Sequence, residues 1–405
     1  MKAFRKVMAK STEALIQLDD KSFPAILPMN LRNYFDEEME ADWKGPFTFI
    51  QMADPQFGLI EKFILKKEIP HWDEEMALTS AAIQCINKMR PKPRFVVICG
   101  DMLDAHPNKP DEIKVREEQY EDFVDVFQQL DPEIPLICVC GNHDICDEPT
   151  PLSYIIYKKQ FGPDFFSFRV GGVKFVVVNS QYFKKPQCLP KRTEKQLEFL
   201  KNIHDTTAQH LVVFQHIPFF VDHPNEEEVS YLNIEKENRF QIMDILDQQG
   251  VKYIFCGHYH RNGGGRYKNF EQVVTSALGG PFGDDPSGFR ICHVTEHGIF
   301  HQYIPVIVTT EKIPKALSHN KLHGSSSRQH FIKFLNTLTP NGERSGSAKS
   351  DTVKRSTGGE EDKENLDTSV FQPPPPPEPY TLQDLLTFRL FQTFSRAFAT
   401  PKYWR

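Results

Sequence analysis

Residues 135–144 decide the fold class, because they join a short apolar run to a group of chemically active side chains. The stretch consists of Pro135-Leu-Ile-Cys-Val-Cys140, followed directly by Gly141-Asn142-His143-Asp144. A β-rich apolar run of this length, without strict alternation, is typical of a strand that is covered on both faces. In α/β sheets, ligands bind at the carboxyl ends of the strands. The stretch therefore predicts a buried strand that delivers polar groups to a site.

Short apolar runs of the same kind recur along the chain, at residues 47–52, 94–99, 173–178, 211–214 and 251–256. Helices are predicted between several of them. One follows from the three- and four-residue spacing of apolar residues between Tyr120 and Leu130, and another ends at Gly250. Strands that alternate with helices predict an α/β fold with sheets sandwiched between helices.

Two local patterns add detail to this fold. Thr193 and Gln196 predict a capping box at the start of a further helix. Gly171-Gly172 lies between two β-like runs and predicts a hairpin. Because a hairpin pairs antiparallel strands, we expect mixed sheets.

Side chains that bind metals follow five of the six runs. Three runs are followed directly by Gly100-Asp101, Gly141-Asn142-His143-Asp144 and Gly257-His258-Tyr259-His260. Two more are followed after one residue by Asp54-Pro55-Gln56 and by His216. Carboxylates, an amide and imidazoles at one sheet edge are suitable ligands for divalent metal ions.

Each of these motifs alone also has a purely structural interpretation. Asp101 and Asn142 follow glycines and suit turns. A single histidine such as His216 is more often a satisfied core or surface residue than a ligand. Their joint occurrence, in order and each after a strand-like run, favours the metal site.

The composition limits the class of protein. The 405 residues include 48 Lys and Arg against 54 Asp and Glu, a net charge of −6, which argues against a dedicated nucleic-acid-binding protein. No run approaches the roughly 18 apolar residues of a membrane-spanning helix. Eight cysteines are too few for a disulfide scaffold, so we expect a reducing compartment and a cytoplasmic location.

The chain divides by composition into four parts. We expect a polar leader at 1–43, the main globular domain at 44–310, a low-complexity, Pro-rich and disordered linker at 311–380, and a short amphipathic segment at 381–405. Pro373–Pro377 predicts a polyproline II rod, a ligand for SH3 or WW domains. The last segment suits either a helix docked on the domain or one that binds a partner or a membrane surface, and the sequence does not choose between them.

The ordered motifs resemble those of the calcineurin-like metallophosphoesterase superfamily. Longer stretches resemble one branch, the calcineurin-like phosphoesterase domain-containing protein 1 family, over roughly residues 43–310: Trp43-Lys44-Gly45-Pro46-Phe47, the eight residues from Ala53 to Ile60, Phe214-Gln215-His216-Ile217-Pro218, and the six residues from Gly257 to Asn262. The resemblance implies two mixed sheets packed as a sandwich, flanked by helices, with a site for two divalent cations (Mn, Mg, Fe or Zn) at one edge.

The resemblance also implies a role for each motif residue. Asp101 would bridge the two cations. The first would also bind Asp54, His260 and Gln56, and the second Asn142, His216 and His258. His143 would donate a proton to the leaving oxygen, and Asp144 would orient its imidazole. Asp104 either bonds to a ligand or only caps its loop.

The implied activity is that of a cytoplasmic serine/threonine protein phosphatase acting on a kinase of the Akt group. Hydrolysis would proceed by direct attack of a hydroxide that bridges the cations. Two alternatives stay open at this stage: a phosphodiesterase for nucleotides or lipids, and a non-catalytic metal-binding scaffold.

Two positions depart from the wider superfamily. Gln56 stands where most members carry a histidine, which predicts a weaker first site or one that prefers oxygen-loving ions. The named branch shares this glutamine. No arginine follows Asp104 to clamp phosphate; Arg261 or Arg266 would have to supply the clamp, or else both are solvated loop charges.

Overall fold

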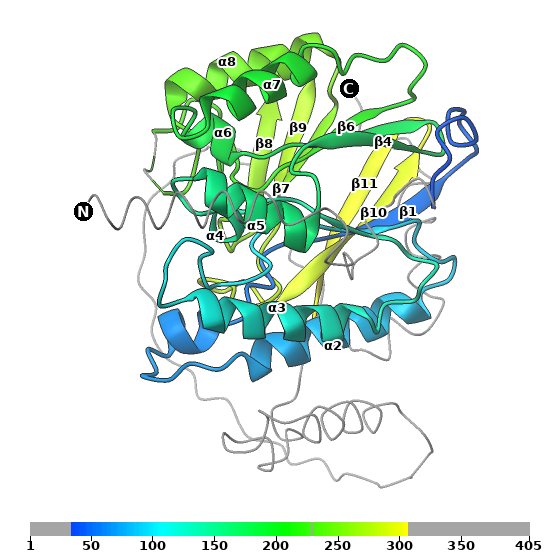
Figure 1. The fold of residues 1–405 in the computed structure, drawn as a ribbon. Coiled ribbons are helices and arrows are strands. Elements are labelled where there is room, and N and C mark those ends of the chain that lie inside the picture. Colours follow the sequence, from blue (N-terminus) through cyan, green and yellow to red (C-terminus); the bar gives the residue numbers. More distant parts are fainter. Residues whose placement is uncertain (1–33, 228, 230, 307–405) are drawn as a thin grey trace, which may run out of the picture. The chain divides into compact units, whose positions relative to one another are not determined.

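The computed structural model describes residues 34–227, 229 and 231–306 (Figure 1). Its strands are β1 (Phe47–Met52), β2 (Val96–Ile98), β3 (Leu136–Cys138), β4 (Phe166–Val170), β5 (Val173–Val177), β6 (Leu211–Phe214), β7 (Tyr253–Cys256), β8 (Gly263–Tyr267), β9 (Phe270–Val274), β10 (Gly288–Thr295) and β11 (Gly298–Pro305). Its helices are η2 (Ile60–Ile64, a π-helix), α2 (Asp73–Lys88), α3 (Ile113–Phe127), α4 (Asn142–Ile145), α5 (Pro151–Phe161), α6 (Gln181–Lys184), α7 (Pro190–Leu200) and α8 (Lys236–Gln248).

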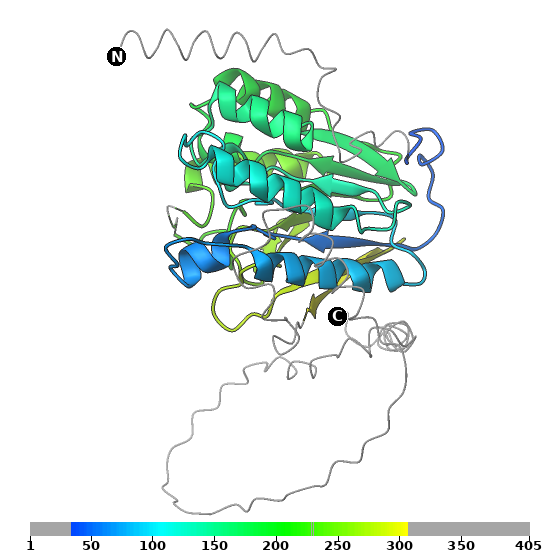
Figure 2. The ribbon, with the colours of Figure 1, turned by 60° about the horizontal axis from the view of Figure 1, so that its bottom comes forward.

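Two mixed sheets lie between layers of helices. One sheet has the order β11-β10-β1-β2-β3, and the other has the order β4-β5-β6-β7-β9-β8. Figures 1 and 2 show α7 and α8 on one side of the strands and α2 on the opposite side. The predicted α/β sandwich flanked by helices is confirmed.

Parallel pairing places several strand ends at one edge of each sheet. In the first sheet β1, β2 and β3 run parallel, and in the second β5, β6, β7 and β9 run parallel. The predicted hairpin joins β4 to β5, which pair antiparallel with Val170 opposite Val173. Its two turn residues, Gly171 and Gly172, both have positive φ angles, of 54° and 83°, as a two-residue hairpin turn requires.

The core has a separate layer on each face of each sheet. In β1, Phe49 faces the second sheet and packs against Phe175, Phe214 and Phe255, whereas the next residue, Ile50, belongs to the cluster on the helix side. Burying one such phenylalanine contributes about 1.5–3 kcal/mol to the free energy of unfolding. Burial on both faces explains why the strand runs lack strict alternation.

The fold begins before the expected residue 44. Phe35 is buried and stacks on Phe168, while Glu40 forms an ion pair with Arg94 and accepts the main-chain N–H of Gly171. Residues 34–43 therefore contribute to the core, and the expectation of a polar leader without core contacts is wrong for them. Five of the ten residues from 34 to 43 are acidic, so the composition alone indicated a polar segment.

The predicted capping box at Thr193 and Gln196 is wrong. Helix α7 begins three residues earlier, at Pro190, which suits the first position of a helix because it needs no N–H partner. Gln196 is buried and exchanges two hydrogen bonds with the main chain of Asn179. The side chain that suggested a cap thus fastens the helix to the loop that follows β5.

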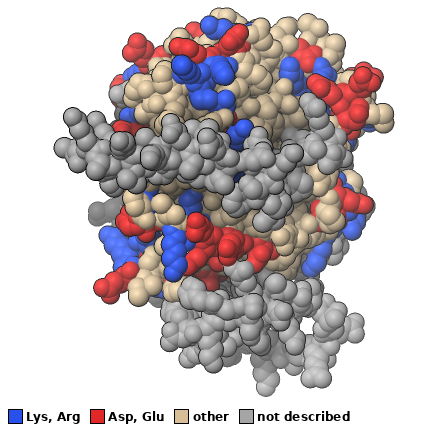
Figure 3. Space-filling model, in the orientation of Figure 1, with Lys and Arg blue, Asp and Glu red and all other residues tan. Residues whose placement is uncertain are grey.

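Several expectations lie outside the described residues: the leader up to residue 33, the whole linker, including Pro373–Pro377, and the amphipathic segment. Within the described part of the chain, no helix has both the length and the apolar character needed to cross a bilayer. On the face seen in Figure 3, basic and acidic side chains lie side by side, which fits the small net charge.

Candidate metal centre

The loops that follow five strands converge on one buried site. β1, β2 and β3 deliver residues from the first sheet, and β6 and β7 deliver residues from the second. Main-chain hydrogen bonds extend the pairing of β1 with β2 into the loops, from Asp54 N–H to Gly100 O and from Gln56 N–H to Asp101 O. The site side chains are all buried: Asp54, Gln56, Asp101, Asn142, His216, His258 and His260.

The backbone at the site is in an unusual conformation. Eight described residues other than glycine have positive φ angles, and five of them are Asp54, Gln56, Asp101, His258 and His260. Such a conformation costs of order 1 kcal/mol or more per residue and persists only where the surrounding structure enforces it. Five of the eight positive φ angles outside glycine occur at these positions, which indicates that the placement of the side chains outweighs the cost of the strained backbone.

Glycines in the motifs leave room for the acidic side chains. A Cβ atom on Gly141 would lie 2.1 Å from Oδ1 of Asp101, and one on Gly257 would lie 2.5 Å from Oδ2 of Asp54. No side chain fits at such distances. These glycines are needed because the carboxylates pack directly against the neighbouring main chain.

Each of the three candidate ligand histidines, at positions 216, 258 and 260, forms a hydrogen bond from one ring nitrogen to a main-chain carbonyl. Because a carbonyl only accepts, that nitrogen must carry the proton, and in the neutral ring the other nitrogen keeps a free lone pair. This arrangement is usual for histidines that bind metals. The bonds run from Nδ1 of His216 to Cys99 O (2.7 Å), from Nε2 of His258 to Tyr231 O (2.7 Å), and from Nδ1 of His260 to Gly280 O (2.6 Å).

The free nitrogens of two histidines meet an amide and a carboxylate. Nε2 of His216 lies 3.1 Å from Nδ1 of His258, 2.9 Å from Oδ1 of Asn142 and 3.3 Å from Oδ2 of Asp101. Donor atoms of Asp101, His216 and His258 lie within 4.8 Å of one another, as one ion would require. This is the ligand set expected for the second cation.

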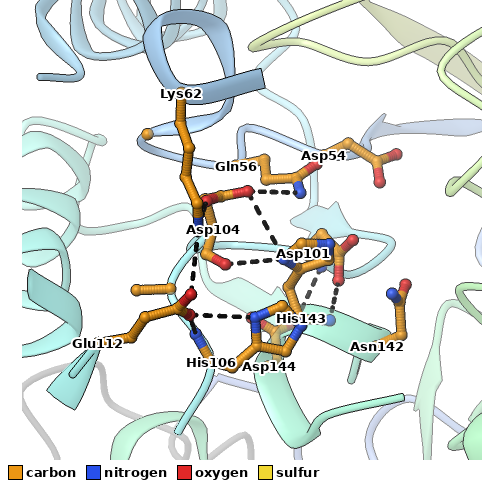
Figure 4. A network of polar contacts seen from close by, with 12 residues as sticks. Asp54, Gln56, Lys62, Asp101, Asp104, His106, Glu112, Asn142, His143 and Asp144 are labelled. Carbon is orange, nitrogen blue, oxygen red and sulfur yellow. Dashed lines mark hydrogen bonds and ion pairs between the residues drawn. The ribbon is translucent and has the colours of Figure 1, made fainter. Parts of the chain in front are cut away.

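The ligand set expected for the first cation lies beside it. Nε2 of His260 is 3.4 Å from Oδ1 of Asp54. Gln56 donates from Nε2 to Oδ1 of Asp104 (3.2 Å), which leaves its buried Oε1 atom without a hydrogen-bond partner (Figure 4). An unpaired buried oxygen is costly unless it has a ligand. The residues present therefore fit a divalent cation.

The charged groups of the site shift one another's pKa values. Burial raises the pKa of Asp101, but His216 and His143 outweigh it and hold that pKa well below its usual range. Burial lowers the pKa of His216, but Asp101 and Asp54 raise it to about 9. Burial and the neighbouring His216 lower the pKa of His258 to about 3, which keeps this ring neutral and able to bind metal.

His143 lies beside the ligands but is held differently from them. Its Nδ1 donates to the main-chain carbonyl of Asp104 (2.7 Å), and its Nε2 lies 3.4 Å from the hydroxyl of Tyr231. Its main-chain N–H donates to Oδ1 of Asp101 (2.8 Å). The ring is thus fixed at Nδ1, and Nε2 lies near the hydroxyl of Tyr231.

The role expected for Asp144 is contradicted. Instead of orienting His143, its carboxylate accepts the main-chain N–H groups of Gly141 (2.8 Å), Asp101 (2.8 Å) and Met102 (3.1 Å). Asp144 sits in the first turn of α4, so its side chain folds back onto the preceding loop. It fixes the loop that carries Asp101, and the carbonyl of Asp104 orients the histidine.

Sequence reasoning missed one supporting residue, Arg116, and left the role of another, Asp104, undecided. Arg116 is buried in α3 and donates to the main-chain carbonyls of Ala105, His143 and Asp144. It lies four residues before Tyr120, the first residue of the predicted apolar face, and that spacing was the available signal. Asp104 accepts from Gln56 at Oδ1 and from Lys62 at Oδ2 (2.8 Å), so it does bond to a candidate ligand.

The two arginines considered for phosphate binding contact other groups. Arg261 is exposed, and its guanidinium lies 5.8 Å from the ring centroid of Tyr259. Arg266 forms an exposed ion pair with Glu271 (3.2 Å).

Comparison with known proteins agrees with this geometry. The model of the calcineurin-like phosphoesterase family matches residues 47–262. The chain belongs to this family, and it is a metal-dependent phosphatase. It is 42% identical over 285 residues to the serine/threonine-protein phosphatase CPPED1 of Homo sapiens, across 69% of this chain and 90% of that relative. The CPPED1 of Danio rerio is 40% identical over 303 residues, across 73% and 94%. The resemblance inferred from the motifs is confirmed.

Solved structures of other phosphatases are similar in fold. Purple acid phosphatase PPD1 from yellow lupin (Lupinus luteus) seeds has a TM-score of 0.46 and 12% identity, covering 64% of this chain and 52% of that one. A dimetal phosphatase from Danio rerio has a TM-score of 0.44 and 14% identity, covering 65% and 98%.

Proposed function

We propose that the protein is a serine/threonine protein phosphatase that uses two divalent cations to hydrolyse phosphomonoesters. The observation that carries this proposal is the convergence of seven buried ligand side chains beside one histidine that is not part of the set. Relatives that are named serine/threonine-protein phosphatases support the substrate class.

The ligand residues divide into two groups that share Asp101. Asp54, Gln56 and His260 would hold the first ion, and Asn142, His216 and His258 the second. When bound, the ions supply a water that is nucleophilic at neutral pH and neutralise the charge of the phosphate. Gln56 presents a carbonyl oxygen, so the first position favours an oxygen-preferring ion such as Mn²⁺ or Mg²⁺ over softer ions.

His143 would complete the reaction as the proton donor. Its Nδ1 is committed to the carbonyl of Asp104, so Nε2 is the atom that would protonate the leaving oxygen. Such proton transfer is worth about 10²–10⁴-fold in rate. Asp144 and Arg116 would act indirectly, by fixing the loops that carry Asp101 and His143. Arg261 stays a proposed phosphate contact.

The proposed substrate and location come from the branch that the motifs resemble. The branch that the motifs resemble supports a kinase of the Akt group as substrate, and a cytoplasmic location. Eight free cysteines are consistent with that location, because reduced thiols persist in the cytosol.

The test uses purified full-length protein, stripped of metal and reloaded with Mn²⁺, Mg²⁺, Fe²⁺ or Zn²⁺ in turn. Phosphate release is measured from phosphoserine and phosphothreonine peptides, with a phosphotyrosine peptide and a cyclic nucleotide as competing substrates. The proposal expects metal-dependent hydrolysis of the first two. Cleavage of the cyclic nucleotide without that of the peptides would instead make the protein a phosphodiesterase. Tight metal binding without any hydrolysis would make it a scaffold.

A further inference from the structure

Tyr231 lies in the loop between β6 and α8 and turns its hydroxyl into the candidate metal centre. The residue is 50% exposed, yet its Oη lies 3.0 Å from Nδ2 of Asn142 and 3.4 Å from Nε2 of His143. The hydroxyl therefore touches both a candidate ligand and the candidate proton donor. No motif in the sequence pointed to this residue.

The directions of these hydrogen bonds follow from the partners. Nδ2 of Asn142 can only donate, so Oη of Tyr231 accepts from it. Nδ1 of His143 donates to the carbonyl of Asp104, so in the neutral ring Nε2 carries a lone pair. In that neutral ring the tyrosine hydroxyl donates to Nε2. In the protonated ring, which would be the proton donor, Nε2 donates to the hydroxyl oxygen instead, so the pair can form in both states.

Tyr231 is itself held in place. Its main-chain carbonyl accepts from Nε2 of His258 (2.7 Å), and its ring lies 4.9 Å from that of His258, measured between centroids. Asn142 is also held, because its Nδ2 donates to Asp147 as well (2.8 Å). Contacts with His258 and Asn142 thus fix the position of the hydroxyl beside His143.

We propose that Tyr231 is a positioning residue for proton donation: its hydroxyl holds Nε2 of His143 toward the candidate metal centre, and the leaving oxygen of the substrate would replace the hydroxyl as the partner of Nε2 when the proton is donated. This inference rests on the proposed function. It assigns no metal-binding role to Tyr231 and no proton transfer from its phenol.

The test compares two substrates that differ in how much they need a proton donor. The p-nitrophenolate released from p-nitrophenyl phosphate is a good leaving group, so its oxygen needs little protonation. A phosphoserine peptide releases an alkoxide, a poor leaving group whose oxygen must be protonated. In Tyr231→Phe, we expect kcat on the peptide to fall about tenfold, the effect of one hydrogen bond, and kcat on p-nitrophenyl phosphate to change little. We expect KM and the Mn²⁺ content to match those of the wild type.

A matched control removes a hydroxyl elsewhere. Tyr267 donates to Asp244 (2.7 Å) on α8, and Tyr267→Phe should leave both substrates unaffected. Combining Tyr231→Phe with His143→Ala should cost nothing beyond His143→Ala alone, because the tyrosine acts through the histidine. An equal loss on both substrates, or a further loss in the double variant, would overturn the inference.

One readout does not depend on turnover, and so separates this inference from the proposed function. In crystals of Tyr231→Phe, the ring of His143 should occupy more than one orientation, whereas the wild-type ring should occupy one. A single unchanged orientation in the variant would contradict a positioning role, whatever the activity of the wild type. Wild-type activity on the peptide tests the proposed function alone.

Discussion

Asp101 is held at its main chain and at both carboxylate oxygens. Its Oδ1 accepts the main-chain N–H of His143, its Oδ2 faces His216, and its own N–H is bound by Asp144. A residue fixed at its main chain and at both oxygens is preorganised to receive a cation with little rearrangement. The bridging role proposed for it follows from that rigidity.

Replacing Asp101 should therefore reduce metal binding at both positions. Asp101→Asn removes the shared charge, and elemental analysis of the purified variant should find less of both ions than in the wild type. Asp131→Asn is the control, since Asp131 forms a surface ion pair with Lys92. Two full equivalents of metal in Asp101→Asn would exclude a bridging role.

Replacing His143 should separate catalysis from metal binding. Loss of the proton donor in His143→Ala should lower kcat on a phosphoserine peptide by about 10²–10⁴-fold, with metal content unchanged. His297→Ala changes an exposed histidine in the turn between β10 and β11 and should have no effect. Wild-type turnover in His143→Ala would remove this histidine from the mechanism.

At the scale of elements, helix α2 supports the loop that carries Gln56. Glu75, fully buried in the first turn of α2, accepts the N–H groups of Gly58 (3.2 Å) and Ile60 (2.8 Å) through one oxygen. Its other oxygen is buried without a partner. Burial raises the pKa of Glu75 from 4.5 to about 8, although the main-chain donors oppose that rise.

This raised pKa predicts the pH dependence of stability. Between pH 4.5 and about 8 the folded protein keeps a proton on Glu75 that the unfolded chain has released, so the free energy of unfolding should fall as pH rises through this window. Urea unfolding across that range should give a flatter profile for Glu75→Gln than for the wild type. Parallel profiles would contradict the assignment.

Elements with a strong local pattern could be predicted from the sequence, and those that depend on distant partners could not. The buried strands, the hairpin and α8 carry their own signal. β8 consists of Gly263-Gly264-Gly265-Arg266-Tyr267 and is a strand only because it pairs with β9. Residues 34–43 likewise gain their structure from contacts made far along the chain.

The same division holds for the site. Ligand residue types follow strand-like runs, so their positions were visible. The groups that hold the site residues in place could not be predicted from the sequence. They are main-chain carbonyls, or side chains that the tertiary structure brings to the site: Asp104 O for His143, Arg116 from α3, and Tyr231 from a loop. Every residue has a main-chain carbonyl, so a pattern of residue types cannot indicate which carbonyl orients a side chain.

At the scale of the whole molecule, the site joins the two sheets. The first sheet supplies Asp54, Asp101 and Asn142, and the second supplies His216, His258 and His260. Ions bound between them would link the sheets in the folded state only, and would stabilise it by mass action.

Metal removal should therefore lower the thermal unfolding midpoint. At a free Mn²⁺ concentration of about 100 times Kd, we expect a midpoint about 5–10 °C above that in EDTA. The shift should be smaller in Asp101→Asn. Equal midpoints for the wild type in Mn²⁺ and EDTA would show that the ions do not join the sheets.

All proposed ligands lie between residues 54 and 260, so hydrolysis should not require the end of the chain. A variant ending at residue 340 should hydrolyse p-nitrophenyl phosphate with the kcat of the full-length protein. Loss of solubility or of activity would show that later residues belong to the catalytic domain, and would move the proposed boundary at residue 310.

A crystal structure determined with Mn²⁺, using anomalous scattering to locate the ions, tests the central claim most directly. The account predicts two ions that share Asp101, one also bound by Asp54, Gln56 and His260 and the other by Asn142, His216 and His258. A single ion, or a pair bound elsewhere on the protein, would contradict it.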